Sequence, residues 1–477
     1  MRKTKFLTMV MWIFLLMPLY KMNAQELSGD ELKLKEKMAW WKDAKFGMFM
    51  HWGLYSKTAG FWKGKKAKGN EHFMLHERIP WKEYAKIADK FNPVKFNADQ
   101  WIKTARDAGM KYFVITTKHH DGFAMFNSPS SDYDIVDRTP YGKDPMKELA
   151  CACRKYGVKL GFYYSLGRDW QDPDAPTNWP VKAGRSNTWD YPDEDAKVFA
   201  RYFERKVKPQ VKEIMTQYAP VDILWFDTPG MISEPESREL REYVLSFNPD
   251  CIINSRVGHS MGDYLVLEQN ISEKSISKPW ESCITMGRNW GYIEYDTVYK
   301  SPEVLVRQLL DIVSKGGNYL LNNGPKPDGT MTEKAIENLK IVGKWMRKNA
   351  EGIYGTSPWK QASEIPQPEQ TQKESNTKSE KNTMKDTDND ATSKKIFPQV
   401  FFTQKEGAVY AFVSSWDGKT ALIKSLATGR FKKIKKVELV GTSKTVEWKQ
   451  TPGGLSLSLP KYKRNKIPIS GFKINAE

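Results

Sequence analysis

The chain has 477 residues, of which 40% are hydrophobic and 13% aromatic, enough for one large core and a second, smaller one, which excludes a small disulfide-stapled scaffold. Lys and Arg outnumber Asp and Glu by 75 to 57, and the formal net charge of +18 weakly favours acidic surroundings. Basic runs such as 63–66 and 432–436 have no nucleic-acid-binding motif around them, so we interpret them as solvated surface and expect no nucleic-acid partner.

Residues 1–24 have the pattern of a signal peptide. Basic residues at the start precede an apolar run over 6–19, and Ala24 precedes the predicted cleavage site. This run is shorter than the roughly 20 residues that span a bilayer, and it contains Pro18. We therefore expect the mature chain to be exported, to a periplasm or out of the cell, with no membrane span.

Residues 25–360 form the predicted catalytic domain, in which short apolar strands alternate with amphipathic helices, as in parallel α/β folds. The predicted strands are Phe46–His51, Tyr112–Thr116, Lys159–Tyr164, Asp222–Phe226, Cys251–Asn254 and Tyr319–Leu321. The predicted helices are Trp81–Phe91, Ala98–Ala108, Pro145–Tyr156, Glu194–Gln217, Ser237–Leu245 and Glu303–Lys315. This repetition predicts a (β/α)8-like, TIM-type barrel closed in part by irregular segments. An open doubly wound sheet is the alternative, but no Gly-rich phosphate loop follows a predicted strand.

Residues 361–396 differ in composition from the rest of the chain. They are rich in Gln, Glu, Lys, Ser, Asn, Thr and Asp and nearly free of apolar side chains, which predicts a flexible linker. Beyond it, 397–477 contains alternating runs such as Ala408–Val413, with turn signals that include Pro452-Gly453-Gly454. We expect a small antiparallel β-sandwich domain there.

Several polar residues stand where predicted barrel strands end, which is where active sites of such barrels lie. Asp227 follows four apolar residues, and a carboxylate there is costly to bury unless it is paired. It either serves a ligand or caps the following turn. Trp225 points to the same side of the strand, and a Trp beside a carboxylate is typical of sugar sites. Arg256 follows a further strand.

Three histidines also lie near strand ends. His51 ends the first predicted strand, and His119 and His120 follow the second. Each is either a hydrogen-bonded core residue or a ligand-binding residue. A metal site made of these three is an alternative, but it lacks a helical His-x-x-x-His spacing, so we expect no metal and no organic cofactor.

Seven segments, in order, resemble the successive motifs of the family 29 α-L-fucosidases over roughly residues 34–360. They are Phe46–Gly53, Lys118–Phe123, Gly161–Ser165, Leu224–Asp227, Gly262–Tyr264, Trp280–Cys283 with Asn289–Tyr292, and Gly316–Asn322. The resemblance implies a glycosidase that releases terminal fucose with retention, with Asp227 as nucleophile. It implies that further pocket positions are His51, His119, His120, Tyr164, Trp225, Arg256 and Trp290, the last beside the methyl group of the sugar.

Two glutamates are candidates for the acid/base. Glu268 resembles the glutamate of the family's Gly-Asp-Tyr-x-Thr-Pro-Glu-Gln loop, although Val and Leu replace Thr and Pro. Glu281, in Trp-Glu-Ser-Cys, is the rival and could equally orient the site from behind. A third glutamate, Glu71, matches a substrate-binding position, but the Trp that follows it in the family is His72 here.

The expected substrates are fucosylated oligosaccharides or glycoproteins, with the linkage left open, and a homo-oligomer is compatible with the sequence. Retaining hydrolysis needs one carboxylate to attack the anomeric carbon and a second carboxyl group to protonate the leaving oxygen. The alternatives are a fucose-binding, lectin-like protein without catalysis and a metal-dependent hydrolase that uses the histidines.

Overall fold

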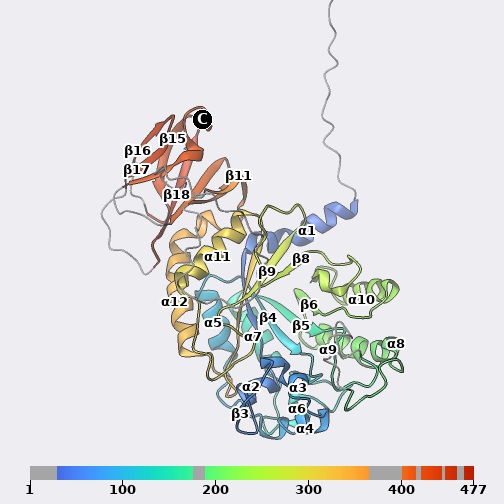
Figure 1. Ribbon diagram of the computed structural model, residues 1–477. Helices are drawn as coiled ribbons and strands as arrows, with labels where there is room; N and C mark the ends of the chain where they lie inside the picture. Colours follow the sequence, from blue (N-terminus) through green and yellow to red (C-terminus); the bar gives the residue numbers. More distant parts are fainter. Residues whose placement is uncertain (1–28, 176–187, 365–399, 415–419, 443–445, 459–466) are drawn as a thin grey trace, which may run out of the picture.

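The computed structural model describes residues 29–175, 188–364, 400–414, 420–442, 446–458 and 467–477 (Figure 1). Its main feature is an eight-stranded sheet in which all paired neighbours are parallel, in the order β7-β6-β5-β4-β1-β10-β9-β8. The strands are β1 (Phe46–Met50), β4 (Tyr112–Lys118), β5 (Lys159–Ser165), β6 (Ile223–Asp227), β7 (Ile252–Ile253), β8 (Leu265–Glu268), β9 (Trp280–Thr285) and β10 (Asn318–Asn323).

The sheet curls until its two end strands meet. Just beyond β7, Asn254 forms a parallel bridge with Tyr264, which precedes β8. The Asp263 amide donates to the Ile253 carbonyl at 2.7 Å, and the Ser255 amide to the Tyr264 carbonyl at 2.8 Å. Only the short 3-10 helix η5 (Ser255–Val257) occurs in this connection. The predicted barrel with irregular closing segments is therefore confirmed.

Helices cover the outside of the barrel, and most were predicted from the sequence. The outer helices are α5 (Ala98–Asp107), α7 (Pro145–Tyr156), α9 (Lys208–Gln217), α10 (Glu234–Phe247), α11 (Pro302–Ser314) and α12 (Glu333–Asn349). The predicted helix 194–217 begins at Phe199, as α8 (Phe199–Tyr202) and the π-helical turn η4 (Phe203–Val207). The predicted helix 81–91 is divided into α4 (Trp81–Ala85) and η2 (Ala88–Lys90). Side-chain hydrogen bonds cap the first turn of several helices. For example, the Asp144 carboxylate accepts from two backbone amides of α7.

Helix α1 (Gly29–Ala44) closes the N-terminal end of the barrel. Its Met38 and Trp41 belong to the same buried cluster as the inward-facing strand residues Phe49 and Trp225. The Asn318 side-chain amide donates to the Trp41 carbonyl at 2.7 Å. Helix α1 thus fills the barrel interior at the amino-terminal ends of the strands. The cavity opens at their carboxyl ends.

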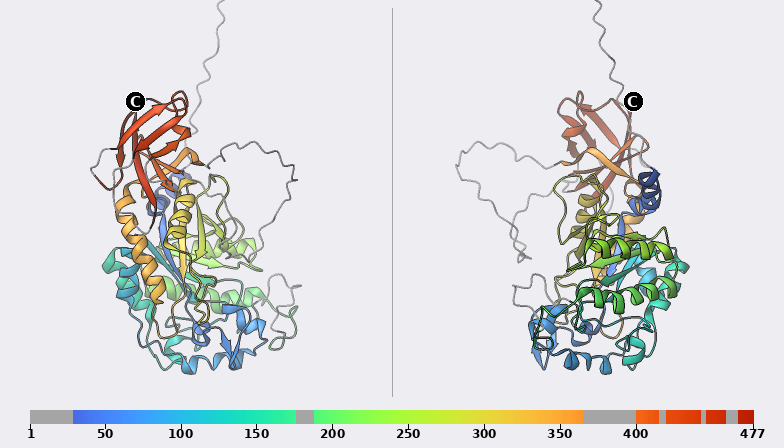
Figure 2. Two further views of the ribbon diagram at one scale, coloured as in Figure 1. Left: turned by 60° about the vertical axis from the view of Figure 1, so that its left-hand side comes forward. Right: turned by 90° about the vertical axis from the view of Figure 1, so that its right-hand side faces the viewer.

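Small segments over the carboxyl ends of the strands complete the open side of the barrel. These are α2 (Leu54–Thr58), β2 (Phe61–Trp62), β3 (Lys65–Lys66), η1 (Asn70–His72), α3 (Phe73–His76) and α6 (Ile135–Arg138). Figures 1 and 2 show them at the opposite end of the molecule from the C-terminal sheets.

The C-terminal part consists of two antiparallel sheets that share one apolar core. Their strands are β11 (Ser357–Glu364), β12 (Val400–Lys405), β13 (Ala408–Ser414), β15 (Ile434–Leu439) and β18 (Ile469–Ala476) in one sheet, and β14 (Thr420–Ile423), β16 (Glu447–Thr451) and β17 (Gly454–Ser458) in the other. The predicted β sandwich is confirmed. It is attached to the barrel: the Trp345 indole on α12 donates to the Ile469 carbonyl at 2.9 Å.

One predicted boundary needs correction. Strand β11 pairs with β12 in antiparallel register, so residues 361–364, which the prediction placed in the linker, belong to the C-terminal sheet. Their polar composition is that of an edge strand with one solvated face. The rest of the predicted linker and the predicted signal peptide lie outside the described residues. Among the residues that the structure describes, no helix is long and apolar enough to cross a bilayer.

Candidate active site

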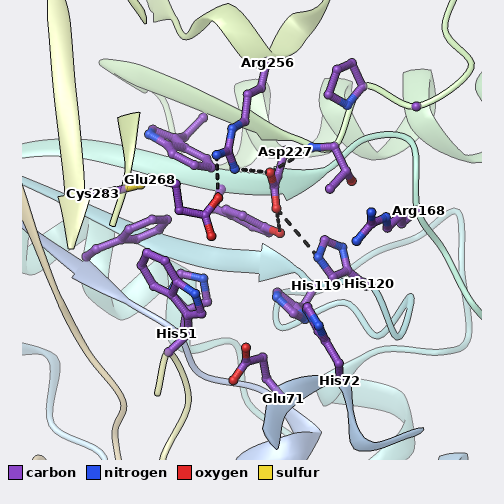
Figure 3. A pocket seen from close by; sticks show the side chains of 17 residues that line it. His51, Glu71, His72, His119, His120, Arg168, Asp227, Arg256, Glu268 and Cys283 are labelled. Carbon is purple, nitrogen blue, oxygen red and sulfur yellow. Dashed lines mark hydrogen bonds and ion pairs between the residues drawn. The ribbon is translucent and has the colours of Figure 1, made fainter. Parts of the chain in front are cut away.

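A cavity of about 530 Å³ opens at the carboxyl ends of the barrel strands (Figure 3). Acidic, basic, imidazole and aromatic side chains all face it, a mixture suited to a ligand with many hydroxyl groups. Its walls are formed by Phe49, His51, Glu71, His72, His119, His120, Tyr163, Arg168, Trp225, Asp227, Thr228, Pro229, Gly230, Arg256, Glu268, Cys283 and Trp290.

Asp227, the last residue of β6, lies deep in this pocket. Its Oδ2 accepts from the Tyr163 hydroxyl at 2.7 Å, and its Oδ1 accepts from Arg256 Nη1 at 2.5 Å and the Thr228 amide at 2.8 Å. Burial acts to raise the pKa of this carboxyl, but the Arg256 charge and these hydrogen bonds outweigh it and hold the pKa below its ordinary value. Asp227 is therefore an ionised, oriented carboxylate that faces the cavity and also accepts from the first amide of the following turn.

Arg256 connects Asp227 to the second carboxylate of the pocket. While Nη1 holds Asp227, Nη2 donates to Glu268 Oε2 at 2.5 Å. The guanidinium also lies 5.1 Å from the centroid of the Trp225 ring. Figure 3 shows the two carboxylates on adjacent sides of this one planar group. The Glu268 side chain is 43% exposed and that of Asp227 11%, so Glu268 lies at the mouth and Asp227 at the base.

The tyrosine of this site is Tyr163, whereas the sequence prediction named Tyr164. Side chains alternate along a strand, so on β5 Tyr163 and Ser165 face the barrel interior and Tyr164 faces outward. There the Tyr164 hydroxyl donates to Gln210 Oε1 at 2.8 Å, away from the pocket. Ser165, a polar residue at the strand end, was the signal in the sequence that could have fixed this parity.

Three predicted histidines lie together on the pocket wall. His51 Nδ1 is 2.7 Å from Asn322 Oδ1, and His120 Nδ1 is 2.6 Å from Ser165 Oγ. Burial lowers the pKa of all three rings, to about 4 for His51 and well below the ordinary value for His119 and His120. These imidazoles are therefore neutral near pH 7. In His51 and His120 one ring nitrogen already has a protein partner, so the other is left for a ligand hydroxyl group.

Glu71 and Trp290 form another wall of the pocket. Glu71 is buried, and its pKa is raised to about 7 by burial, against the opposing effect of backbone hydrogen bonds from Gly291 and Trp290. The Trp290 ring lies 4.9 Å from that of His51, which gives this wall an apolar face. His72, which stands where the family has a Trp, also faces the cavity.

Glu281 is absent from the pocket wall. It is fully buried inside the barrel below the pocket, where it accepts from the Tyr112 hydroxyl at 2.7 Å and the Trp225 indole at 3.0 Å. Burial raises its pKa to about 7. Glu281, predicted as the rival acid/base, a substrate contact or a residue that orients the site from behind, thus does not line the cavity and holds the Trp225 indole from behind.

The pocket thus brings together Asp227, Glu268, His51, Glu71, His119, His120, Trp225, Arg256 and Trp290, and leaves out Tyr164 and Glu281. It adds residues that the sequence analysis did not place in the site, among them Phe49, Tyr163, Arg168 and Cys283. No sequence signal marked Arg168, which lies in a loop after β5. A carboxylate pair at the carboxyl end of a (β/α) barrel, in a dead-end pocket of sugar-binding character, defines the class of glycoside hydrolases.

Comparison with known proteins specifies the family. The α-L-fucosidase family model matches residues 19–351, and that of the α-L-fucosidase C-terminal domain matches residues 389–474. The chain belongs to the family 29 α-L-fucosidases. Tissue α-L-fucosidase of Mus musculus is 29% identical over 460 residues, which are 90% of this chain and 89% of that protein.

Solved structures of similar proteins agree. α-L-Fucosidase isoenzyme 1 from Paenibacillus thiaminolyticus is 30% identical, with a TM-score of 0.78 over 93% of this chain and 100% of that one. The α-L-fucosidase AlfC from Lactobacillus casei, in complex with α-L-fucose, is 39% identical, with a TM-score of 0.63 over 66% of this chain and 99% of that one. The chain is accordingly an α-L-fucosidase, and its substrates are fucosylated glycans.

Proposed function

We propose that the chain is an exo-acting, retaining α-L-fucosidase in which Asp227 is the nucleophile and Glu268 the acid/base. The observation that carries this assignment is the single guanidinium of Arg256, which holds both carboxylates at 2.5 Å inside one pocket. Retaining enzymes keep their two carboxyl groups about 5 to 5.5 Å apart, and two groups that share one guanidinium are compatible with that spacing.

The depth of each group fits its role. Asp227 is at the base, beside the aromatic side chains that fill the barrel, so the sugar ring must enter fully for its anomeric carbon to be attacked. Glu268 is at the mouth, where the leaving group remains in solvent. A pocket that is closed below admits a terminal sugar and excludes an internal one, which supports exo action.

The reaction then proceeds in two displacements. The ionised Asp227 attacks the anomeric carbon while Glu268 gives its proton to the departing glycosidic oxygen, which forms a covalent fucosyl ester on Asp227. Water next attacks the same carbon, Glu268 takes up a proton from it, and fucose leaves with its original configuration. The hydrogen bonds from Tyr163 and Arg256 favour Asp227 as the carboxylate and so prepare the first step.

Two solved structures of one similar protein suggest suitable substrates for a test. Structures of AlfC include complexes with 4-nitrophenyl α-L-fucopyranoside and with Fucα(1,6)GlcNAc. We propose that this chain also hydrolyses the aryl fucoside, and that it removes terminal fucose from oligosaccharides or glycoproteins.

The test uses the purified chain without residues 1–24. Wild type is expected to release 4-nitrophenol, and NMR of the first-formed product is expected to show α-L-fucose. Asp227→Ala is expected to lose at least about a thousandfold in kcat, and azide to yield the β-fucosyl azide with this variant. Glu268→Ala is expected to yield the α-azide, because the covalent intermediate still forms.

Glu273→Ala is the matched control, since Glu273 is an exposed glutamate in the loop that follows Glu268. It is expected to behave like wild type. Formation of β-L-fucose as the first product would reject retention, and a Glu268→Ala variant with full activity would reject the acid/base assignment. Absence of turnover on the aryl fucoside and on a panel of fucosylated oligosaccharides would favour the lectin-like alternative.

We also propose that residues 1–24 direct export, on the basis of the sequence pattern alone. Expression of the full chain in a Gram-negative host, followed by N-terminal sequencing, is expected to find a mature chain that begins at Gln25 outside the cytoplasm. An intact N-terminus in the cytoplasm would reject export. Light scattering of the same preparation tests whether the chain forms a homo-oligomer.

A further inference from the structure

Three imidazoles converge on one side of the sugar pocket. His72 ends η1, which belongs to the segment after β1, whereas His119 and His120 follow β4. One ring nitrogen of each lies within 4.8 Å of the others. The ring centroids of His119 and His120 are 4.2 Å apart, and that of His72 is 5.1 Å from that of His120 (Figure 3). The family resemblance predicts a Trp at position 72, so this third imidazole is a property of this chain.

The hydrogen bonds around His120 determine which of its nitrogens faces the cavity as an acceptor. The Ser165 hydroxyl donates to the Arg168 carbonyl at 2.8 Å, so its oxygen must accept from His120 Nδ1 at 2.6 Å. The neutral ring therefore carries its proton on Nδ1, and the lone pair on Nε2 points to the pocket, 3.7 Å from Asp227 Oδ2. An imidazole whose other nitrogen donates to a fixed partner is the usual arrangement of a metal ligand.

The second observation concerns a buried ring nitrogen of His119. Its Nδ1 is buried and makes no hydrogen bond to any of the residues that the structure describes. A buried ring nitrogen in this condition gains from any ligand that reaches it, whether a sugar hydroxyl or a cation.

We propose that His72, His119 and His120 bind one zinc ion in the pocket of this fucosidase, and that zinc and the sugar exclude each other. Three imidazoles with a fourth position open to the cavity form a donor set that zinc accepts. Bonds of 2.0 to 2.1 Å in a tetrahedral site place ligand nitrogens about 3.4 Å apart, so the rings must approach by roughly an ångström. Of the three, His72 is half-buried, on the single 3-10 turn η1, whereas His119 and His120 are buried.

The proposed ion is an inhibitor, and no step of hydrolysis passes through it. Zinc at this position occupies the nitrogens that the sugar hydroxyls need and lies beside the nucleophile Asp227. Zinc is therefore expected to raise KM for the aryl fucoside with kcat unchanged, and a chelator is expected to reverse the effect.

The decisive measurement is calorimetric titration of zinc chloride into the chain, prepared without a polyhistidine tag, in a buffer that does not bind metals. Wild type is expected to bind one zinc ion per chain, and saturating L-fucose to weaken that binding. His72→Phe keeps an aromatic ring but removes the ligand, and it is expected to lower zinc affinity at least about tenfold. Its thermal transition verifies that it folds. The exposed His259 lies outside the pocket, so His259→Ala is the matched control and is expected to bind zinc like wild type.

Failure of the wild type to bind a single zinc ion, or equal affinity in His72→Phe, would overturn the site. Zinc binding that is indifferent to L-fucose would overturn the competition. Only the competition between zinc and L-fucose and the KM measurement rest on the proposed fucosidase function. The zinc stoichiometry and the loss of zinc affinity in His72→Phe are measured without substrate. A failed zinc site and a failed sugar site are therefore distinguishable.

Discussion

Replacement of Glu281 by glutamine is expected to stabilise the chain at pH 8 far more than at pH 5. The Glu281 carboxyl is fully buried between the Tyr112 hydroxyl and the Trp225 indole, and burial raises its pKa from the ordinary 4.5 to about 7. A glutamine has nearly the same shape. Its carbonyl can accept from the indole, and its amide can donate to the Tyr112 oxygen, so both contacts are retained.

The magnitude follows from proton linkage. Because the pKa is raised in the folded state, stability from this group is complete below about pH 4.5 and is lost as the pH rises toward 7. One pKa unit corresponds to about 1.36 kcal/mol, so the complete loss for a pKa raised from 4.5 to about 7 is roughly 3.4 kcal/mol. About 0.8 kcal/mol of it has already occurred at pH 5. The difference in unfolding free energy between Glu281→Gln and wild type should therefore increase by roughly 2.5 kcal/mol from pH 5 to pH 8.

Denaturant unfolding of both proteins at several pH values measures this difference, because all other titrating groups are common to the pair. Glu281→Ala is the contrast: it leaves the two donors unsatisfied and opens a cavity, so it should destabilise the chain at every pH. A difference between Glu281→Gln and wild type that is independent of pH would refute the reasoning. A fall in kcat of about a hundredfold or more in Glu281→Gln, with azide rescue, would return Glu281 to the role of acid/base.

The other predictions concern the support of the pocket. Tyr163→Phe removes a hydrogen bond that lowers the pKa of Asp227, so the acidic limb of the kcat/KM profile should move to higher pH; an unmoved limb would contradict this. Lys118→Met breaks its fully buried ion pair with Asp169, which keeps Lys206 as a second partner at 2.7 Å, and should cost about 2 kcal/mol in denaturant unfolding, whereas a neutral effect would show that the pair adds no stability. Gly122→Ala should also be strongly destabilising in a thermal melt, because φ is +76° and the new Cβ would lie 2.2 Å from Asp169 Oδ1; an unchanged transition would contradict it.

The sequence was most informative where one periodicity dominates. Helix α7 was predicted with its observed bounds, since an Asp cap, a Pro in the first turn and a closing Gly surround a clear apolar face. The long apolar strands were predicted to within two residues at each end. Strands β8 and β9 were missed: β8 is only half-buried, and β9 places Glu281 and Ser282 among its buried residues, so neither has an uninterrupted apolar pattern.

The direction of a side chain was harder to predict from the sequence than the position of its strand. Tyr163 and Tyr164 are chemically identical, and a displacement by one residue reverses the face that a strand residue occupies. Glu281 shows a related limit. Its inward direction could be inferred from the strand, but its depth below the pocket depends on the side chains stacked above it, among them Trp225.

A residue buried beneath the pocket, as well as those that line it, holds the pocket side chains in position. Glu281 holds the Trp225 indole, the Trp225 ring lies against Arg256, and Arg256 holds both Asp227 and Glu268. One buried carboxyl group thus connects to both carboxylates of the pocket through a chain of direct contacts. Such a chain explains why a polar residue at position 281 suits the barrel interior: an apolar residue would fill the space but would leave the indole without an acceptor.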